Sequence, residues 1–338
     1  MKTRREFLEE AALGAAGLGV AGFGVTGVAT ARPASAEGTG FFYDPRCLAH
    51  VVPSRNGVAR PEVKERLIRI MEVLEERGLI DEMIAFDALA DPMPYIAAHH
   101  TPEHVASIRE IDVSGPLAEL AVAGALGAVA AVAHGDVRNA FCAIRPPGHH
   151  ANNTGAEEGF CYYSNAAIAA RYAQRAHGFE RVAIIDWDYH HGNATQNAFY
   201  DDPTVLVYST HDWAAYPETG DPSLAGEGDG MGTNINVHLD CGSRDLDMLR
   251  AWDEKLEPAI AAFDPDFIIV SAGFDSRKDD LLGCFDVEDD AFRRMTRAAM
   301  GFADSCCEGR LVSLLEGGYN IDGLALATAA HVETLLGG

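Results

Sequence analysis

Five short runs of apolar residues, separated by longer segments with helical periodicity, organise most of the chain. Each run is four or five residues long and shows almost no alternation of polar and apolar positions. The runs cover residues 140–144, 182–185, 205–208, 267–270 and 311–315. Strands that carry apolar side chains on both faces are covered on both sides, so this pattern predicts a single open parallel sheet with helices on both faces.

The intervals between these runs carry helical signals. Residues 62–78 repeat apolar side chains at Leu67, Ile70 and Leu74, and Gly78 supplies a stop. Four more helices are expected over residues 118–134, 166–176, 289–302 and 323–336. We find neither an internal repeat nor a linker after residue 36, so residues 37–338 are expected to form one domain.

The first 36 residues follow a different pattern. The pair Arg4-Arg5 precedes an uncharged, Gly/Ala-rich run from Ala11 to Ala31, and the small residues Ala34-Ser35-Ala36 follow. The run is long enough to span a bilayer, but its glycine content makes it a weak permanent anchor. We therefore expect a twin-arginine export signal over residues 1–36, cleaved after Ala36, and a periplasmic or extracellular protein. The alternative is a protein tethered to the membrane by an uncleaved signal.

The charge balance is strongly acidic. The chain has 26 Lys and Arg against 51 Asp and Glu, a formal net charge of -25. The signal segment has four basic and three acidic residues, so the acidity belongs to the rest of the chain. A field of this sign repels phosphate backbones and attracts cations. Nucleic-acid binding is therefore not expected, whereas a cationic substrate would be favoured.

The seven cysteines are an odd number and include no Cys-x-x-Cys pair. Such a set predicts neither a disulfide framework nor a thiolate zinc site. Because twin-arginine substrates are exported already folded, such a protein can keep buried thiols reduced, and the cysteines agree with the export signal. The adjacent Cys306 and Cys307 are the one place to look for redox chemistry.

A cluster of polar residues follows each of the five apolar runs. The clusters are 145–150, 186–193, 209–211, 271–275 and 316–320. In an open parallel sheet, the carboxyl ends of the strands lie along one edge, where ligand crevices form. We therefore expect these five clusters to build one site.

Three of these polar residues are suited to binding a metal ion. Asp186, Asp188 and His190 are spaced two apart as a strand ends, so their side chains can point the same way. Asp275 ends another strand. Asp188, His190 and Asp275 together offer two oxygens and one nitrogen, which suits Zn²⁺ with an open position for substrate. A lone aspartate at such a place is more often a loop cap, but the combination favours a metal site.

Two further clusters can supply proton transfer and oxyanion stabilisation. The pair His149-His150 follows Arg-Pro-Pro-Gly, whose prolines fix the turn, and an imidazole beside a metal can move protons to and from the reacting groups. Tyr319 follows Gly317-Gly318, a turn that can bring the phenol against a substrate carbonyl.

These segments together resemble the histone deacetylase and acetylpolyamine amidohydrolase superfamily, closest to its class II branch. The similarity covers roughly residues 41 to 330. The segments that carry it are Phe42-Tyr43-Asp44-Pro45-Arg46, His100-Thr101-Pro102-Glu103-His104-Val105, Arg-Pro-Pro-Gly-His-His-Ala at 145–151, Gly-Phe-Cys at 159–161, Asp-Trp-Asp-Tyr-His-His-Gly-Asn at 186–193, Ser-Ala-Gly-Phe-Asp at 271–275 and Leu-Glu-Gly-Gly-Tyr-Asn at 315–320. The resemblance implies an arginase/deacetylase-like fold and a zinc-dependent deacetylase domain over 37–338.

The resemblance also implies a role for each site residue. The ligands of one catalytic Zn²⁺ would be Asp188, His190 and Asp275. His150 would be the main general base and acid, with His149 as its electrostatic partner. Asp186 and Asn193 would orient these histidines. Tyr319 would polarise the acetyl carbonyl.

The same resemblance implies a substrate tunnel and a second ion. Gly159 and Phe160 would line the tunnel, with Tyr216 on the opposite wall. A structural potassium ion is implied near Asp186, Asp188, His190, Ser209 and Thr210.

Four positions depart from patterns common in the family. Asn193 stands where many class I members have Asp, which should leave His150 less basic. Ala194 replaces a usual Gly, and Tyr216 replaces a common Phe. Leu282 lies where polyamine-selective members carry Glu, which weakens a polyamine-specific interpretation.

The leading hypothesis is hydrolysis of an N-acetyl amide with release of acetate. A binuclear manganese ureohydrolase would need an additional run such as Asp-Ala-His-Ala-Asp, which the chain lacks. A non-catalytic acyl-amine binding protein would not require Tyr319 and both histidines. Acetylated polyamines, acetyl-lysine peptides and small acetylated metabolites all remain open as substrates.

Overall fold

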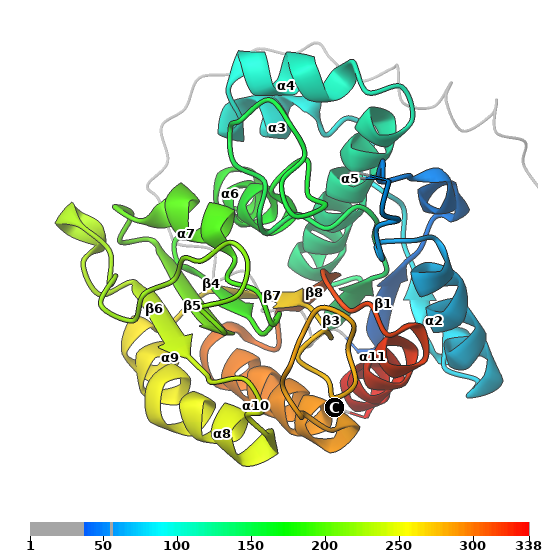
Figure 1. Ribbon diagram of the computed structural model, residues 1–338. Coiled ribbons are helices and arrows are strands. Elements are labelled where there is room, and N and C mark those ends of the chain that lie inside the picture. Colours follow the sequence, from blue (N-terminus) through cyan, green and yellow to red (C-terminus); the bar gives the residue numbers. More distant parts are fainter. Residues whose placement is uncertain (1–36, 55–56, 338) are drawn as a thin grey trace, which may run out of the picture. The chain divides into compact units, whose positions relative to one another are not determined.

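The computed structural model describes residues 37–54 and 57–337, and the proposed export signal lies outside them. Its centre is one sheet of eight strands, all parallel, in the order β2-β1-β3-β8-β7-β4-β5-β6 (Figure 1). The strands are β1 Thr39–Phe42, β2 Ile84–Ala85, β3 Asn139–Cys142, β4 Val182–Asp186, β5 Val205–His211, β6 Asn234–His238, β7 Phe267–Ala272 and β8 Leu311–Leu315. The prediction of a single open parallel sheet is confirmed.

The five predicted runs are β3, β8, β7, β4 and β5, which lie next to one another in the sheet. Their side chains alternate between two cores. In β4, Val182 and Ile184 belong to one apolar cluster, whereas Ala183 and Ile185 belong to the other. The edge strand β6 was not predicted, because its sequence Asn-Ile-Asn-Val-His alternates polar with apolar residues.

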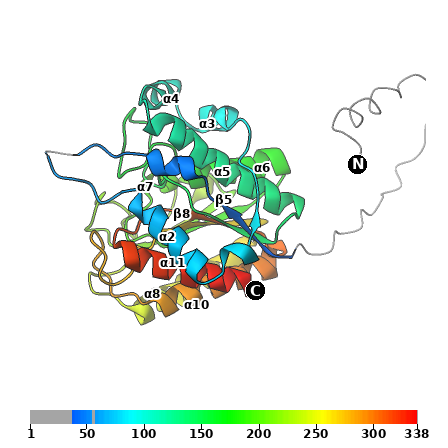
Figure 2. The same cartoon turned by 90° about the vertical axis from the view of Figure 1, so that its right-hand side faces the viewer.

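Helices cover both faces of the sheet (Figures 1 and 2). One layer contains α3 Met93–His99, α4 Pro102–Arg109, α5 Ser114–His134, α6 Asn165–His177 and α7 Asn193–Phe199. The other layer contains α2 Glu65–Glu76, α8 Asp245–Ala251, α9 Glu257–Phe263, α10 Asp289–Cys307 and α11 Ile321–Leu336. A π-helical turn, Trp252–Leu256, joins α8 to α9. All five predicted helices are present, and the short α3, α7, α8 and α9 were not predicted.

Helix α5 is apolar all round because it is enclosed by the protein. By length and composition it could cross a membrane, yet 78% of its most apolar window is buried inside the fold. Its glycines allow close packing: a Cβ atom at Gly124 would collide with the Phe42 ring, and one at Gly127 with the backbone of Asp87. Helix α5 therefore fits the role of a core helix, as its place against β1 and β3 indicates.

The sequence predicted no disulfide framework, and five cysteines are free, but one pair that was not predicted is bonded. Cys241 and Cys284 form a disulfide, with Cα atoms 5.2 Å apart. That separation lies within the range disulfides need. Cys241 follows β6 and Cys284 lies in the loop before α10, so the bond joins two loops that are 43 residues apart in sequence. Cys306 and Cys307 are free and lie at the end of α10.

We expect thiol titration to detect this disulfide. In the native protein, Cys306 is the accessible free thiol of the described residues, since Cys47, Cys142, Cys161 and Cys307 are buried. Non-reducing peptide mapping should recover a Cys241–Cys284 cross-link, and mild reduction should add two titratable thiols. Cys241→Ser should remove the cross-link and leave Cys284 free. Peptides with both residues alkylated before reduction would contradict the assignment.

Buried histidines predict acid sensitivity of the fold. Burial lowers the pKa of His331 to about 3, and burial with the neighbouring His99 lowers that of His100 to about 3. The unfolded chain takes up these protons near pH 6.5, so unfolding becomes easier as the pH falls from about 6.5 toward 3. Each histidine contributes a slope of about 1.4 kcal/mol per pH unit within that window. The free energy of unfolding of the metal-free protein can be measured in urea at several pH values between about 6.5 and 3. Its slope against pH should be smaller by about this amount in His331→Gln than in the wild type, and an equal slope would contradict the prediction.

Candidate active site

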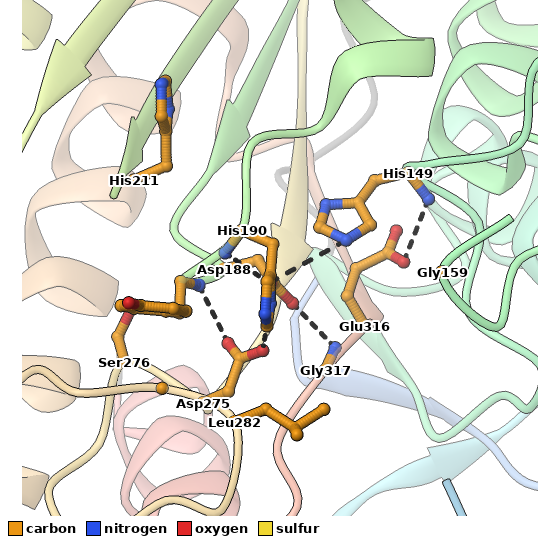
Figure 3. A network of polar contacts seen from close by, with 12 residues as sticks. His149, Gly159, Asp188, His190, His211, Asp275, Ser276, Leu282, Glu316 and Gly317 are labelled. Atoms are coloured by element: carbon orange, nitrogen blue, oxygen red, sulfur yellow. Dashed lines mark hydrogen bonds and ion pairs between the residues drawn. The ribbon is translucent and has the colours of Figure 1, made fainter. Parts of the chain in front are cut away.

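The carboxyl edge of the sheet brings the predicted site residues together (Figure 3). Asp186 is the last residue of β4, Asp275 follows β7 after two residues, and Glu316 comes directly after β8. His149 lies in the loop that follows β3. Because all strands run parallel, these loops leave the sheet at the same edge, and side chains far apart in sequence converge there.

Asp188, His190 and Asp275 form a compact cluster. One ligand atom from each lies within 4.8 Å of the others, and all three residues are buried. The Nδ1 atom of His190 is 3.1 Å from Asp188 Oδ1 and 2.9 Å from Asp275 Oδ2. The outer oxygens are held by backbone N–H groups, since Gly317 N donates to Asp188 Oδ2 at 2.8 Å and Tyr189 N donates to Asp275 Oδ1 at 2.8 Å. The carboxylates are therefore fixed in orientation.

This donor set fits a divalent metal ion. Two carboxylates and one imidazole in a buried cluster match the ligands of catalytic zinc sites, which leave a position open. The space around them is kept clear by glycine. A Cβ atom at Gly317 would lie 2.6 Å from Asp188 Oδ2 and closer still to Asp275 Oδ2. Buried like charges this close are costly without a cation between them.

The two histidines of the dyad lie side by side with different partners. Their ring centroids are 4.0 Å apart. His149 Nδ1 is 2.9 Å from Asp186 Oδ2, and His150 Nδ1 is 2.8 Å from the amide oxygen of Asn193. Each histidine thus has one nitrogen fixed by a neighbour, which leaves the other nitrogen for the site.

The surroundings push the pKa values of the dyad apart. Burial alone would lower the pKa of His149, but the charges of Asp188, Asp186 and Glu316 outweigh it and hold the pKa well above its ordinary value. Burial and the positive charges of His149 and His190 hold the pKa of His150 well below its ordinary value. Groups whose pKa values are driven apart in this way can divide acid and base roles, and His150 is the neutral one.

Tyr319 lies buried on a turn that is fixed from two sides. Its backbone N–H and that of Asn320 donate to Asp280 Oδ2 at 2.7 and 2.9 Å. On the other side, Arg66 Nε donates to the Gly318 carbonyl at 2.6 Å, and the guanidinium lies 5.1 Å from the Tyr319 ring centroid. Burial raises the pKa of Tyr319 well above its ordinary value, so the phenol stays a proton donor.

Arg66 belongs to a fully buried ion network beneath this turn. Its Nη1 atom is 2.9 Å from Glu62 Oε1, and Arg145 Nη2 is 2.7 Å from Glu62 Oε2. Glu62 was predicted to lie in the first turn of a helix, but the helix begins at Glu65 and Glu62 pairs with the two arginines instead. The network ties the loop before α2 to the turn that carries Tyr319.

An open cleft of about 620 Å³ reaches these groups from the surface. His150, His190 and Tyr319 line it, as do the predicted tunnel residues Gly159, Phe160, Tyr216 and Leu282. A Cβ atom at Gly159 would collide with the His150 ring and lie 2.8 Å from the Tyr216 ring. Gly159 also has a φ of +52°, so both space and backbone require glycine here.

The structure adds two residues that were not assigned a role. Glu316 lies beneath the dyad and Asp280 beneath Tyr319, and both accept backbone N–H bonds. Glu316 was visible in Leu-Glu-Gly-Gly-Tyr-Asn, where a charged residue directly after an apolar strand could have drawn attention. Asp280 had no comparable signal. Ala194 lies in regular helix and donates its N–H to the His149 carbonyl at 3.1 Å, so it needs no glycine.

Comparison with known proteins identifies the class that this fold and site define. The family model described as histone deacetylase domain matches residues 112–335. A probable deacetylase of Archaeoglobus fulgidus is 37% identical over 302 residues, which cover 84% of this chain and 82% of that protein. The chain belongs to the histone deacetylase family.

Other relatives point the same way. The polyamine deacetylase HDAC10 of Homo sapiens is 33% identical over 303 residues, covering 82% of this chain and 44% of that protein. The crystal structure of the HDA15 HD domain superposes with a TM-score of 0.83 at 34% identity, covering 90% of this chain and 88% of that one. This chain spans about half the length of several plant and fungal histone deacetylases that it matches.

Proposed function

We propose that the protein is a zinc-dependent amidohydrolase that removes the acetyl group from an acetylated amine. The observation that carries this proposal is the cluster of Asp188, His190 and Asp275 in a cleft whose lining also includes His150 and Tyr319. Metal ligands, a neutral imidazole and a buried phenol in one cleft are the groups that amide hydrolysis requires. A zinc ion in this cluster would act as a Lewis acid, both on the acetyl carbonyl and on the water molecule that attacks it.

The protein's own residues divide the remaining work. His150, held neutral and oriented by Asn193, takes a proton from the attacking water and gives it to the departing amine nitrogen. His149, paired with Asp186, keeps a positive charge beside the region where negative charge develops. Tyr319 donates a hydrogen bond from its phenol to the developing oxyanion.

We propose an acetylated amine on a flexible chain as the substrate. Gly159, Phe160, Tyr216 and Leu282 form walls suited to an alkyl chain, and the acidity of the protein favours a cationic tail. Among the relatives, one is named a polyamine deacetylase and another a histone deacetylase. For an exported protein, a small acetylated amine or an acetyl-lysine peptide is the better candidate.

The test is acetate release from a substrate panel. The purified protein, loaded with zinc, should be given acetylputrescine, acetylspermidine, an acetyl-lysine peptide and an acetylated amino sugar. We expect release from at least one amine with an alkyl chain, none from the amino sugar, and one zinc per chain. Two manganese ions per chain with no acetate from any substrate would refute the proposal.

We also propose a structural potassium ion beside the catalytic cluster. The hydroxyl of Thr210 is buried and has no hydrogen-bond partner among the described residues, which suits an oxygen ligand of a cation. Ser209 precedes Thr210 in β5 and pairs with Asp186 at the end of β4, and Asp188 and His190 lie in the loop that follows. The melting temperature should be higher in KCl than in choline chloride of equal ionic strength, and equal values would count against the ion.

Finally, we propose that residues 1–36 export the folded protein by the twin-arginine route. The support is the Arg4-Arg5 pair, the uncharged run and the small residues before Glu37. Cell fractionation should find the protein outside the cytosol with a mass that lacks these residues. Arg4→Lys combined with Arg5→Lys should retain it inside, and unchanged export would contradict the route.

A further inference from the structure

The carboxylate of Glu316 lies close to the backbone of His149 (Figure 3) and is not part of the cleft lining. Its side chain is fully buried, and Oε2 accepts the backbone N–H of Gly148 at 2.7 Å and that of His149 at 3.2 Å. Oε1 accepts the hydroxyl of Ser271 at 3.3 Å. Among the described residues, the Gly148 and His149 N–H groups have no other acceptor, so Glu316 holds this side of the turn.

The opposite side of the same turn is closely packed. A Cβ atom at Gly148 would lie 2.7 Å from the Tyr163 carbonyl and 2.5 Å from the Asn165 nitrogen. Asn165 Nδ2 donates to the Pro146 carbonyl at 3.2 Å. The dyad turn is thus enclosed between the start of α6 and Glu316.

The main chain of Glu316 belongs to the other catalytic segment. Its N–H donates to the Ala272 carbonyl at 3.1 Å, and its carbonyl accepts Arg66 Nη2 at 2.5 Å. The next residue, Gly317, donates to Asp188, and Tyr319 follows two residues later. Glu316 therefore contacts the turn before His150 through its side chain, and its backbone leads directly into the turn that carries Tyr319.

We propose that Glu316 is a positioning residue that sets the distance between the His149-His150 turn and the Gly317-Gly318-Tyr319 turn. This inference rests on the proposed deacetylase function. Two groups that act on the same carbonyl must be held in register, and a misplacement of about 1 Å can cost about 10²-fold in rate. The carboxylate supplies that register through the length and the acceptors of its side chain, because its hydrogen bonds go to Gly148, His149 and Ser271 and it does not line the cleft.

Three substitutions separate geometry from charge. Glu316→Gln removes the charge but keeps the side-chain length and one oxygen acceptor. The larger contributions of Asp188 and Asp186 still hold the pKa of His149 high, so we expect kcat within about threefold of wild type. Glu316→Asp keeps the charge but shortens the side chain by one methylene, and Glu316→Ala removes the acceptors, so both should lower kcat by about 10²-fold with little change in KM. Glu333→Ala, which removes a carboxylate paired with Arg77 and Arg293 far from the cleft, serves as control.

A second measurement does not depend on catalysis. Amide hydrogen exchange of residues 148–151 should be slow in the wild type and Glu316→Gln and faster in Glu316→Asp and Glu316→Ala, with the melting temperature and zinc content measured in parallel. If the wild type released no acetate but the exchange pattern held, the proposed function would fail and the positioning of the turn would stand. An active Glu316→Asp, or a Glu316→Gln that loses activity with a shifted pH–rate profile and unchanged exchange, would overturn the proposal in favour of a charge effect. If Glu316→Ala does not fold, the Gln and Asp pair still decides between the two.

Discussion

Asp275→Asn should lose the metal ion and about 10³-fold or more of the acetate release. The substitution keeps the shape of the side chain and its acceptor for Tyr189 N, but removes the negative charge 2.9 Å from His190 Nδ1. Lewis acid catalysis contributes several kcal/mol, and each 1.36 kcal/mol is tenfold in rate. Metal analysis after dialysis and an acetate assay with excess zinc measure the two losses separately.

The stability of Asp275→Asn distinguishes loss of metal from loss of fold. Without metal, burial and the charge of Asp188 raise the pKa of Asp275 to about 7, so the wild type carries a buried carboxylate at a cost to folding. We expect metal-free Asp275→Asn to be at least as stable as metal-free wild type. Added zinc should raise the melting temperature of the wild type but not of the variant.

The matched control is Asp290→Asn, an exposed carboxylate in the first turn of α10. It should keep metal content and activity, which shows that loss of one negative charge from an acidic protein is not the cause. An Asp275→Asn protein that retains one tightly bound zinc and wild-type turnover would remove Asp275 from the metal site.

Tyr319→Phe should lower kcat by about 10²- to 10³-fold while the metal stays bound. Loss of a single oxyanion donor typically has this size, because the donor acts on charge that develops only in the transition state. The carboxylates of the metal cluster are oriented by backbone N–H groups rather than by the phenol, and the Tyr319 ring packs at 5.5 Å against Phe160, a contact that the phenylalanine variant would retain. KM should therefore change little. Steady-state acetate release and zinc analysis on the same preparation test both statements.

Tyr95→Phe provides the control for loss of a hydroxyl, since Tyr95 lies on α3 and packs edge-to-face against Tyr172. It should leave kcat unchanged. Because the pKa of Tyr319 is raised well above its ordinary value, the phenol should remain protonated across the assay range, and the basic limb of the pH–rate profile should not report it. Wild-type turnover by Tyr319→Phe would show that the oxyanion is held without this residue.

The centre of the sheet and the main catalytic clusters could be predicted from the sequence. The five runs in β3, β4, β5, β7 and β8 are apolar on both faces, and each is followed by polar residues. A parallel sheet brings such strand ends to one edge whatever the loops between them do. Local spacing brings Asp188 and His190 together, but their nearness to Asp275 also requires β4 and β7 to be neighbours, which only the tertiary structure shows.

The contacts that hold those clusters in place could be identified only from the tertiary structure. Glu316 meets Gly148 across 168 positions, and Arg66 meets Gly318 across 252. The Cys241–Cys284 bond likewise depends on two loops meeting beyond the sheet edge. Apolar periodicity determines which face of an element is buried, but it contains no information on which buried polar group will accept a given N–H. That choice is made only when the loops pack, because each unpaired buried group must find a partner among whatever chain happens to lie beside it.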